Sequence, residues 1–262
     1  MIGQEKLKAQ LNNCNLDNFP NSLILLGEKG CGKHLFVDEI SKHFDLPVIY
    51  LSGKLTQEMI DDIYSKIEPF IYVIENDNLN IKNQNSILKF LEEPLKNSFI
   101  ILLVENENSL LPTILNRCQV WQFEQYTLQQ LQTFDYSDSR ILDIATTPYD
   151  IQMFELPCNN LDTILSLCNN IIDKIPVASF SNILSIINKI KFADTDNDKI
   201  DLNVFMKVLN HVAVQKVIAN ENKYYQMVYK LIDELNNNLQ IFNINKKTAV
   251  ENYLVKMKEI KC

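Results

Sequence analysis

The residues best suited to chemistry lie near the N-terminus, where Gly27 to Lys33 follow the spacing Gly-x-x-x-x-Gly-Lys. Glycines in such a loop let backbone N–H groups turn inward around phosphate oxygens, and a following helix adds partial positive charge at its N-terminus. The lysine can reach the outer phosphates of a nucleotide. The pattern predicts a phosphate-binding loop (P-loop); a glycine turn in an unrelated α/β protein is the alternative. The expected nucleotide-binding residues are Gly27, Gly30, Cys31, Gly32, Lys33 and His34.

The residue after the lysine departs from the usual pattern. A Ser or Thr hydroxyl ordinarily binds Mg²⁺ at this position, and here the residue is His34. Mg²⁺ is a hard ion that prefers oxygen ligands, whereas imidazole is a softer and bulkier nitrogen ligand. We therefore expect that, where ATP or ADP binds as a cofactor, Mg²⁺ binds weakly or not at all, and we expect no dedicated metal site.

The acidic half of a nucleotide-hydrolysing site should follow the third strand. The usual pair is a metal-binding Asp followed by a water-activating Glu, and this chain has Glu75 and Asn76 instead. An amide has no carboxylate to accept a proton, so Asn76 cannot act as a general base. Asp77 could replace it only if the strand end were shifted by one residue. These departures predict weak or absent hydrolysis at this site.

A sheet is needed to bring these segments together. We expect strands at 22–26, 47–51, 70–74, 99–104 and 119–123, and helices at 4–12, 56–67, 82–93 and 110–116, with a further helix ending at Phe44. Short apolar strands separated by helices predict a parallel sheet covered on both faces. Such sheets bind ligands beyond the carboxyl ends of their strands. Residues 27–34 and 75–77 both follow expected strands, so they should meet at that edge.

After about Glu124 the strand pattern disappears. We expect short helical segments at 128–134, 139–146 and 149–156, followed by longer helices at 160–174, 179–191, 201–220, 222–241 and 246–259. The chain is therefore expected to form an α/β domain at 1–124, a small helical lid domain at 125–158, and an all-α C-terminal domain at 159–262.

Two further segments carry a family resemblance. Residues 85–94 read Asn-Ser-Ile-Leu-Lys-Phe-Leu-Glu-Glu-Pro, and residues 113–118 read Thr-Ile-Leu-Asn-Arg-Cys. Together with the P-loop, they resemble the AAA+ clamp-loader family of DNA replication over at least residues 1–124. More loosely, residues 243–254 resemble the end of a helical collar domain. The degenerate ATP site beside a retained Arg-Cys pair is most similar to the bacterial delta-prime type of subunit, with Asn116 replacing the usual Ser.

The resemblance implies an AAA+ P-loop module followed by a helical lid and a collar-type oligomerisation domain. It implies a subunit of a DNA polymerase III holoenzyme that is largely inactive as an ATPase and helps to place a sliding clamp on primed DNA. The implied partners are other clamp-loader subunits, the sliding clamp and primer–template DNA, the last through phosphate contacts to which Lys82 and Lys89 would be weak contributors.

The same resemblance singles out Arg117. In the family, an arginine at this position projects towards the nucleotide of a neighbouring subunit and acts there, in trans, as an arginine finger. Such a guanidinium neutralises charge that develops on the transferred phosphoryl group. The alternative is a surface arginine at the end of a helix, satisfied by carbonyl groups or solvent.

Composition limits the remaining functions. The 33 acidic and 25 basic residues give a net charge of −8, which argues against a broad basic face that grips nucleic acid unaided. No apolar run approaches the ~20 residues that span a bilayer, so we expect a cytoplasmic protein with no membrane partner. The six cysteines include no C-x-x-C pair, which favours free thiols over zinc. Cys31 is either an activated thiol or, as we favour, a small filler.

Two other functions remain open at this point. A stand-alone P-loop ATPase would use the intact loop from Gly27 to Lys33, although His34 and Asn76 argue against it. A nucleotide-binding regulatory scaffold outside replication would need no hydrolysis at all.

Overall fold

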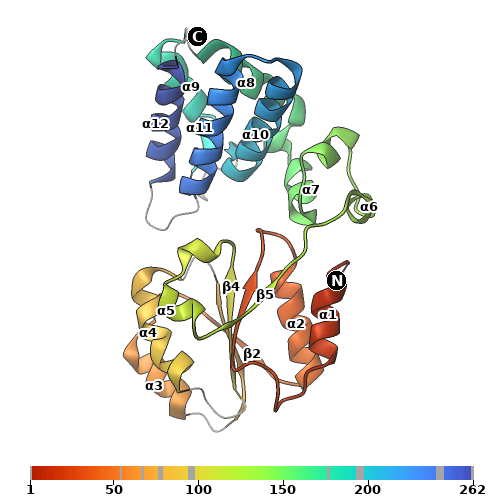
Figure 1. The fold of residues 1–262 in the computed structure, drawn as a ribbon, viewed down its shortest axis with the longest axis vertical. Coiled ribbons are helices and arrows are strands. Elements are labelled where there is room, and N and C mark those ends of the chain that lie inside the picture. The colour runs from red at the N-terminus through yellow and green to blue at the C-terminus, as the bar shows by residue number, and fades with distance from the viewer. Residues whose placement is uncertain are drawn as a thin grey trace. The chain divides into compact units, whose positions relative to one another are not determined.

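The chain divides into two compact units, residues 1–130 and 131–262 (Figure 1). The computed structural model describes residues 2–53, 55–65, 68–75, 79–93, 98–175, 178–192, 198–239 and 245–260. Asn76, Asp77, Pro94 and the first two residues of the segment 243–254 lie outside these ranges. The expected division of the second unit into a lid and a collar-type domain stays a prediction.

The first unit is built on a five-stranded parallel sheet in the order β2-β3-β4-β1-β5. All five strands lie within one residue of their expected bounds; β1 to β4 are short and largely apolar, whereas β5 reads Gln-Val-Trp-Gln and buries only Trp121. The five strands are β1 (Ser22–Leu26), β2 (Val48–Leu51), β3 (Ile71–Glu75), β4 (Phe99–Val104) and β5 (Gln119–Gln122). This confirms the predicted α/β architecture.

Helices cover both faces of this sheet. Figure 1 shows α1 and α2 on one face, and α3, α4 and α5 on the other. Successive side chains of a strand point to opposite faces, and Leu23 and Leu25 of β1 join Phe36 of α2 in one core cluster. The helices are α1 (Glu5–Asn12), α2 (Lys33–Phe44), α3 (Gln57–Ser65), α4 (Ile81–Glu92) and α5 (Pro112–Leu115), with a 3₁₀ turn, η2 (Glu107–Ser109), before α5.

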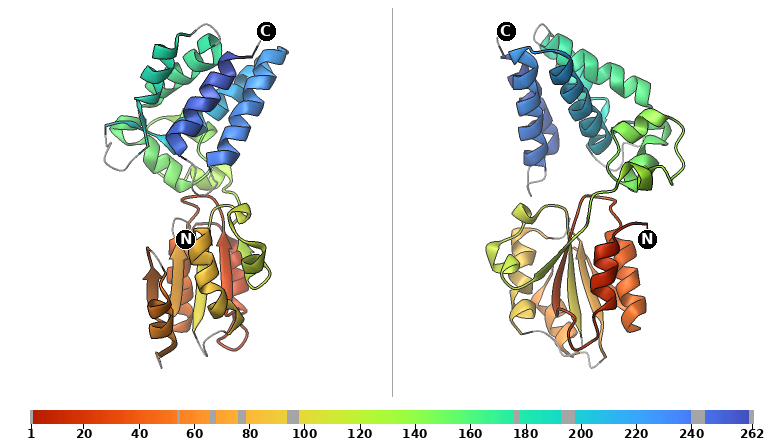
Figure 2. Two further views of the ribbon diagram at one scale, coloured as in Figure 1. Left: turned by 90° about the vertical axis from the view of Figure 1, so that its left-hand side faces the viewer. Right: turned by 45° about the vertical axis from the view of Figure 1, so that its right-hand side comes forward.

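The second unit is mainly helical. Helix α10 (Leu202–Ala219) packs against α8 (Leu161–Lys174) and α11 (Lys223–Leu239), and α12 (Lys246–Lys258) packs against α11 and α9 (Phe180–Ile187) (Figure 2). Before α8 come α7 (Pro148–Phe154) and the 3₁₀ turns η3 (Ser139–Asp143) and η4 (Pro157–Asn159). The short helix α6 (Leu128–Leu131) lies where the two units meet in sequence.

One expectation for this unit was wrong. The helix expected at 179–191 ends at Ile187, and Ile190–Lys191 instead forms a two-residue strand, β6, parallel to β7 (Ile200–Asp201). The short helical segment expected at 139–146 is a 3₁₀ helix over Ser139–Asp143. A two-residue strand is too short to show alternation in the sequence, so only the tertiary pairing of the buried Ile190 and Ile200 identifies it.

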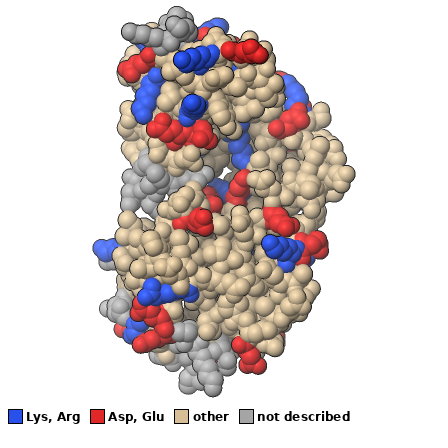
Figure 3. Space-filling model, in the orientation of Figure 1, with Lys and Arg blue, Asp and Glu red and all other residues tan. Residues whose placement is uncertain are grey.

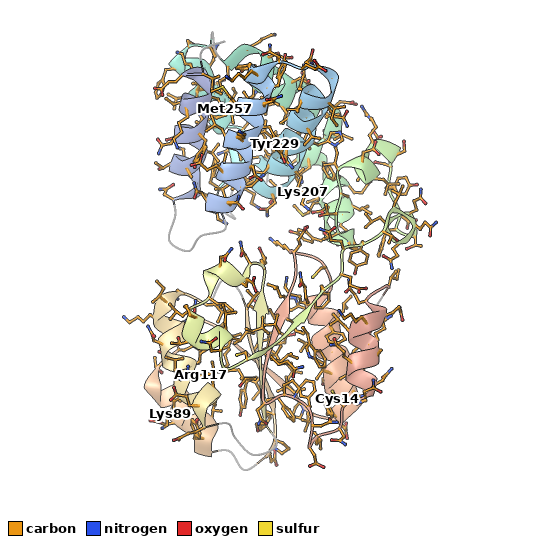
Figure 4. All side chains as sticks on the ribbon, in the orientation of Figure 1. Cys14, Lys89, Arg117, Lys207, Tyr229 and Met257 are labelled. Atoms are coloured by element: carbon orange, nitrogen blue, oxygen red, sulfur yellow. The ribbon has the colours of Figure 1, made fainter. Side chains whose placement is uncertain are left out.

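A buried carboxylate fixes the start of α7. Asp150 Oδ2 accepts hydrogen bonds from the backbone N–H groups of Thr146 and Thr147, each at 2.9 Å. It also lies 2.7 Å from Nζ of Lys207, which α10 contributes (Figure 4). The carboxylate side chain is 8% exposed. Removing a carboxylate from water is unfavourable unless it is paired and hydrogen-bonded, so Lys207 stabilises the contact between α7 and α10.

We expect Lys207→Met to lower the free energy of unfolding by about 2 kcal/mol, because it leaves a buried carboxylate without its cation while keeping the apolar stem. The expected loss of free energy is smaller than for a fully buried ion pair, because Lys207 is itself partly exposed. Lys216→Met is the matched control: its partner Asp173 is 37% exposed, so it should cost less than about 1 kcal/mol. Urea unfolding followed by circular dichroism measures both, and equal losses would contradict the assignment.

Candidate functional site

The P-loop follows directly from the end of β1. The backbone N–H of Gly27 donates to the carbonyl oxygen of Val104 in β4 at 3.0 Å, which ties the loop to the sheet. Gly30 and Gly32 have φ angles of 81° and 101°, a region that favours glycine. A Cβ at Gly27 would lie 2.7 Å from Cys31 Sγ and 2.8 Å from Phe123 Cβ. The packing of the loop therefore requires its glycines.

Lys33 is held inside this loop. It begins α2, is 7% exposed, and its Nζ donates to the carbonyl oxygens of Gly27 at 2.5 Å and Glu28 at 2.9 Å. Burial lowers the pKa of Lys33, and the charges of Cys31, Glu105 and Glu28 oppose that shift. An incoming phosphate would replace the two carbonyl oxygens as acceptors for the ammonium group.

Cys31 packs as a small buried side chain within the loop. It is 3% exposed, and burial raises the pKa of its thiol to about 11. Tyr126 donates a hydrogen bond from its hydroxyl to the Cys31 carbonyl oxygen at 3.0 Å. The thiolate is the reactive form of cysteine, so this environment favours the filler role over an activated thiol.

The two residues at the expected metal positions contact each other. His34 Nε2 lies 2.8 Å from Glu75 Oε1, at the carboxyl end of β3, and donates a hydrogen bond to that carboxylate. Both side chains are partly exposed, at 59% and 44%. The imidazole also stacks on the Tyr50 ring, with centroids 5.9 Å apart and planes at 18°. The predicted meeting of residues 27–34 with Glu75 therefore occurs, whereas Asn76 lies outside the described residues.

This donor set does not fit Mg²⁺, the ion that ordinarily accompanies a nucleotide in a P-loop. Mg²⁺ requires a nearly octahedral shell of oxygen ligands. Position 34 offers an imidazole nitrogen in place of a hydroxyl oxygen, and that nitrogen shares a hydrogen bond with Glu75.

Arg117 lies away from this site, on the surface. It follows α5, and its guanidinium donates to the Thr113 carbonyl oxygen at 2.9 Å and pairs with Glu92 Oε1 at 2.8 Å. Its side chain is 35% exposed. Arg117 precedes the amino end of β5, whereas the P-loop follows the carboxyl end of the adjacent parallel strand β1. Arg117 therefore lies at the end of the sheet where the parallel strands begin, and the P-loop lies at the end where they finish.

Gln84 positions the segment that leads to Arg117, a role that the sequence did not reveal. Its side chain is fully buried in α4. Nε2 donates to the carbonyl oxygens of Leu79 at 2.6 Å and Ser109 at 2.9 Å. Oε1 accepts from the N–H of Leu111 at 2.7 Å. The only signal in the sequence is a polar residue beside the apolar face of a helix, which does not identify its partners.

We expect Cys31 to react slowly with iodoacetamide in the folded protein. With a pKa of about 11 against an ordinary value near 9, the thiolate fraction at pH 8 falls about a hundredfold, and burial restricts access as well. The partly exposed Cys158 should be labelled first, as peptide mass spectrometry can follow, and urea should abolish the difference. Equally fast labelling of Cys31 in the native state would support the activated thiol.

Comparisons with known proteins agree with the motifs. Residues 54–127 match the family described as "DNA polymerase III, delta subunit". The delta-prime subunit of DNA polymerase III from Bacillus subtilis is 33% identical over 141 residues, which are 50% of this chain and 41% of that protein. The subunit of the same name from Haemophilus influenzae is 43% identical over 51 residues, 20% of this chain and 16% of that protein. The matches thus span less than half the length of these relatives.

A solved structure supports the fold. A mutant of RuvB from Thermotoga maritima has a TM-score of 0.50 at 14% identity, with 98% of this chain and 89% of that chain covered. At that identity the likeness concerns the fold alone. With the motifs and the sheet order, the matches support the resemblance: over part of its length the chain is similar to delta-prime subunits of the clamp-loader family, and its fold is an α/β AAA+ module with a helical C-terminal region.

Proposed function

We propose that the chain is a clamp-loader subunit of the delta-prime type that lends Arg117 to the ATP site of a neighbouring subunit. The observation that carries the proposal is the position of this arginine. It is exposed, and it lies at the amino ends of the parallel strands, whereas its own P-loop lies at their carboxyl ends. An arginine so placed has no route to its own nucleotide, whereas an adjoining subunit can approach it from solvent.

The contacts that hold Arg117 are weak enough to exchange. Its partner Glu92 is 51% exposed, and ion pairs in solvent contribute only about 0–1 kcal/mol. A phosphoryl group offers several charged oxygens to the same planar guanidinium and binds it more strongly. Glu92 therefore restrains Arg117 at little cost until a neighbouring nucleotide approaches.

The chain's own site is proposed to bind ATP or ADP with little or no hydrolysis. The loop keeps its glycines and Lys33, which suit phosphate binding. His34 replaces the metal-binding hydroxyl and is paired with Glu75, and Asn76 in the sequence replaces the expected general base. The site would then bind a nucleotide without hydrolysing it.

The proposed partners are the other clamp-loader subunits, the sliding clamp and primer–template DNA in the cytoplasm, with the helical second unit serving oligomerisation. On the face drawn in Figure 3, the described Lys and Arg side chains are interspersed with Asp and Glu. On this face the chain would therefore offer isolated phosphate contacts to DNA rather than a broad basic surface. Lys89 is one candidate, although its ammonium group also lies 5.0 Å from the centre of the Tyr64 ring.

Among the described helices, none combines the length and apolarity needed to cross a bilayer.

In a loader reconstituted with its cognate subunits, we expect Arg117→Ala to reduce DNA-stimulated ATPase activity and clamp loading by about 10³-fold or more at the site that it serves, since arginine fingers contribute factors of that size. Assembly, measured by size-exclusion chromatography, should be unchanged.

Arg140→Ala is the matched control, because the second of the chain's two arginines is also exposed and paired with carboxylates, Asp138 and Asp162. It should leave the ATPase activity unchanged, and Glu92→Gln should preserve it. Full activity of the Arg117→Ala loader would exclude the arginine finger, and rapid ATP turnover by the isolated chain would favour a stand-alone ATPase.

A further inference from the structure

The contact between His34 and Glu75 brings an imidazole nitrogen and a carboxylate oxygen within the distance at which both can bind one ion. A divalent ion that binds imidazole nitrogen and carboxylate oxygen at about 2.0–2.1 Å, at right angles, holds them about 2.9 Å apart. The observed separation between His34 Nε2 and Glu75 Oε1 is 2.8 Å. In the structure the pair shares a hydrogen bond of ordinary length, so an ion would displace that proton and turn the imidazole until its nitrogen faces the ion.

The surroundings of the pair suit an ion that arrives with phosphate. His34 is the second residue of α2 and immediately follows Lys33 of the P-loop, so an ion on this imidazole would lie next to the phosphate-binding loop. Both ligands are partly exposed, which leaves room for more ligands. No group of three metal-binding side chains occurs within the described ranges. Nucleotide phosphate oxygens and water would have to complete the shell.

The chemistry of the pair decides which ion is preferred. Imidazole is a good ligand for Co²⁺, Ni²⁺ and Zn²⁺ and a poor one for Mg²⁺, which also dehydrates reluctantly. The carboxylate of Glu75 suits all of these ions. The replacement of a hydroxyl by His34 thus changes the preferred metal rather than only removing a ligand.

We propose that His34 and Glu75 form a nucleotide-dependent site for a borderline divalent cation such as Co²⁺ or Ni²⁺, in the position that Mg²⁺ occupies in ordinary P-loops. The site rests on the proposed nucleotide binding and is independent of the role of Arg117. It takes a metal complex of a nucleoside diphosphate or triphosphate, whose phosphates the P-loop and Lys33 hold.

The test uses the full-length chain, kept reduced, and a fluorescent ADP analogue titrated in EDTA, Mg²⁺, Co²⁺ or Ni²⁺. We expect the affinity for the analogue to be about tenfold higher with Co²⁺ or Ni²⁺ than with Mg²⁺ or EDTA, the low end of the change that even a group supporting a metal ligand makes. Co²⁺ with ADP should also give visible absorption bands shifted by nitrogen coordination.

Two variants distinguish metal binding by His34 and Glu75 from a purely structural contact between them. His34→Ser should abolish the shifted Co²⁺ bands and reverse the preference towards Mg²⁺, because it restores an oxygen ligand. His43→Gln is the matched control at the other end of α2, where His43 contacts the Cys14 carbonyl oxygen. It should leave both the metal preference and the absorption bands unchanged.

Three outcomes would overturn the proposal: equal affinity in EDTA and in all metals, a preference for Mg²⁺ in the unchanged chain, or no binding of the analogue under any condition. Each of these leaves the loader role intact, because that role is measured separately by assembly and by the effect of Arg117→Ala. Conversely, metal-selective nucleotide binding by a chain that does not join a loader would support this site and contradict the loader role.

Discussion

The direction of the strands constrains this molecule more than any single contact does. Because β1 and β5 run parallel, the loop after β1 and the turn before β5 must lie at opposite edges of the sheet. The P-loop lies at the carboxyl ends of the strands, and Arg117 lies at their amino ends. No side-chain movement brings the two together within one AAA+ module, so a chain that uses both in one reaction must do so across a subunit boundary.

The side chains of Lys33 and Arg117 are both held by acceptor groups from their own chain. Lys33 donates to P-loop carbonyl oxygens, and Arg117 pairs with Glu92. These acceptors keep the cations oriented without a ligand, and a phosphate must displace them. For the exposed Arg117 the displacement costs little. For Lys33 the ligand must also enter a buried loop, whose glycines provide backbone N–H groups in compensation.

The sequence predicted those parts of the fold that depend on local patterns. The strands of the first unit and the P-loop could be located because apolar runs, glycines and a lysine define them along the chain. The short strands β6 and β7 were missed because Ile190 and Ile200 reveal their pairing only in space. The side-chain partners of Gln84 could not be predicted either, since two segments that are distant from each other in sequence, at Leu79 and at 109–111, provide them.

The candidate site shows the same limit at the level of chemistry. From the sequence, His34 and Glu75 were two separate defects, each judged against the residue that it replaces. Their contact at 2.8 Å makes them one feature with its own donor set. Replacing an oxygen by a nitrogen is a loss for Mg²⁺ but a gain for ions that favour imidazole. A substitution in a P-loop therefore has to be assessed together with the residue it meets across the site, because the two side chains together form the donor set offered to an ion.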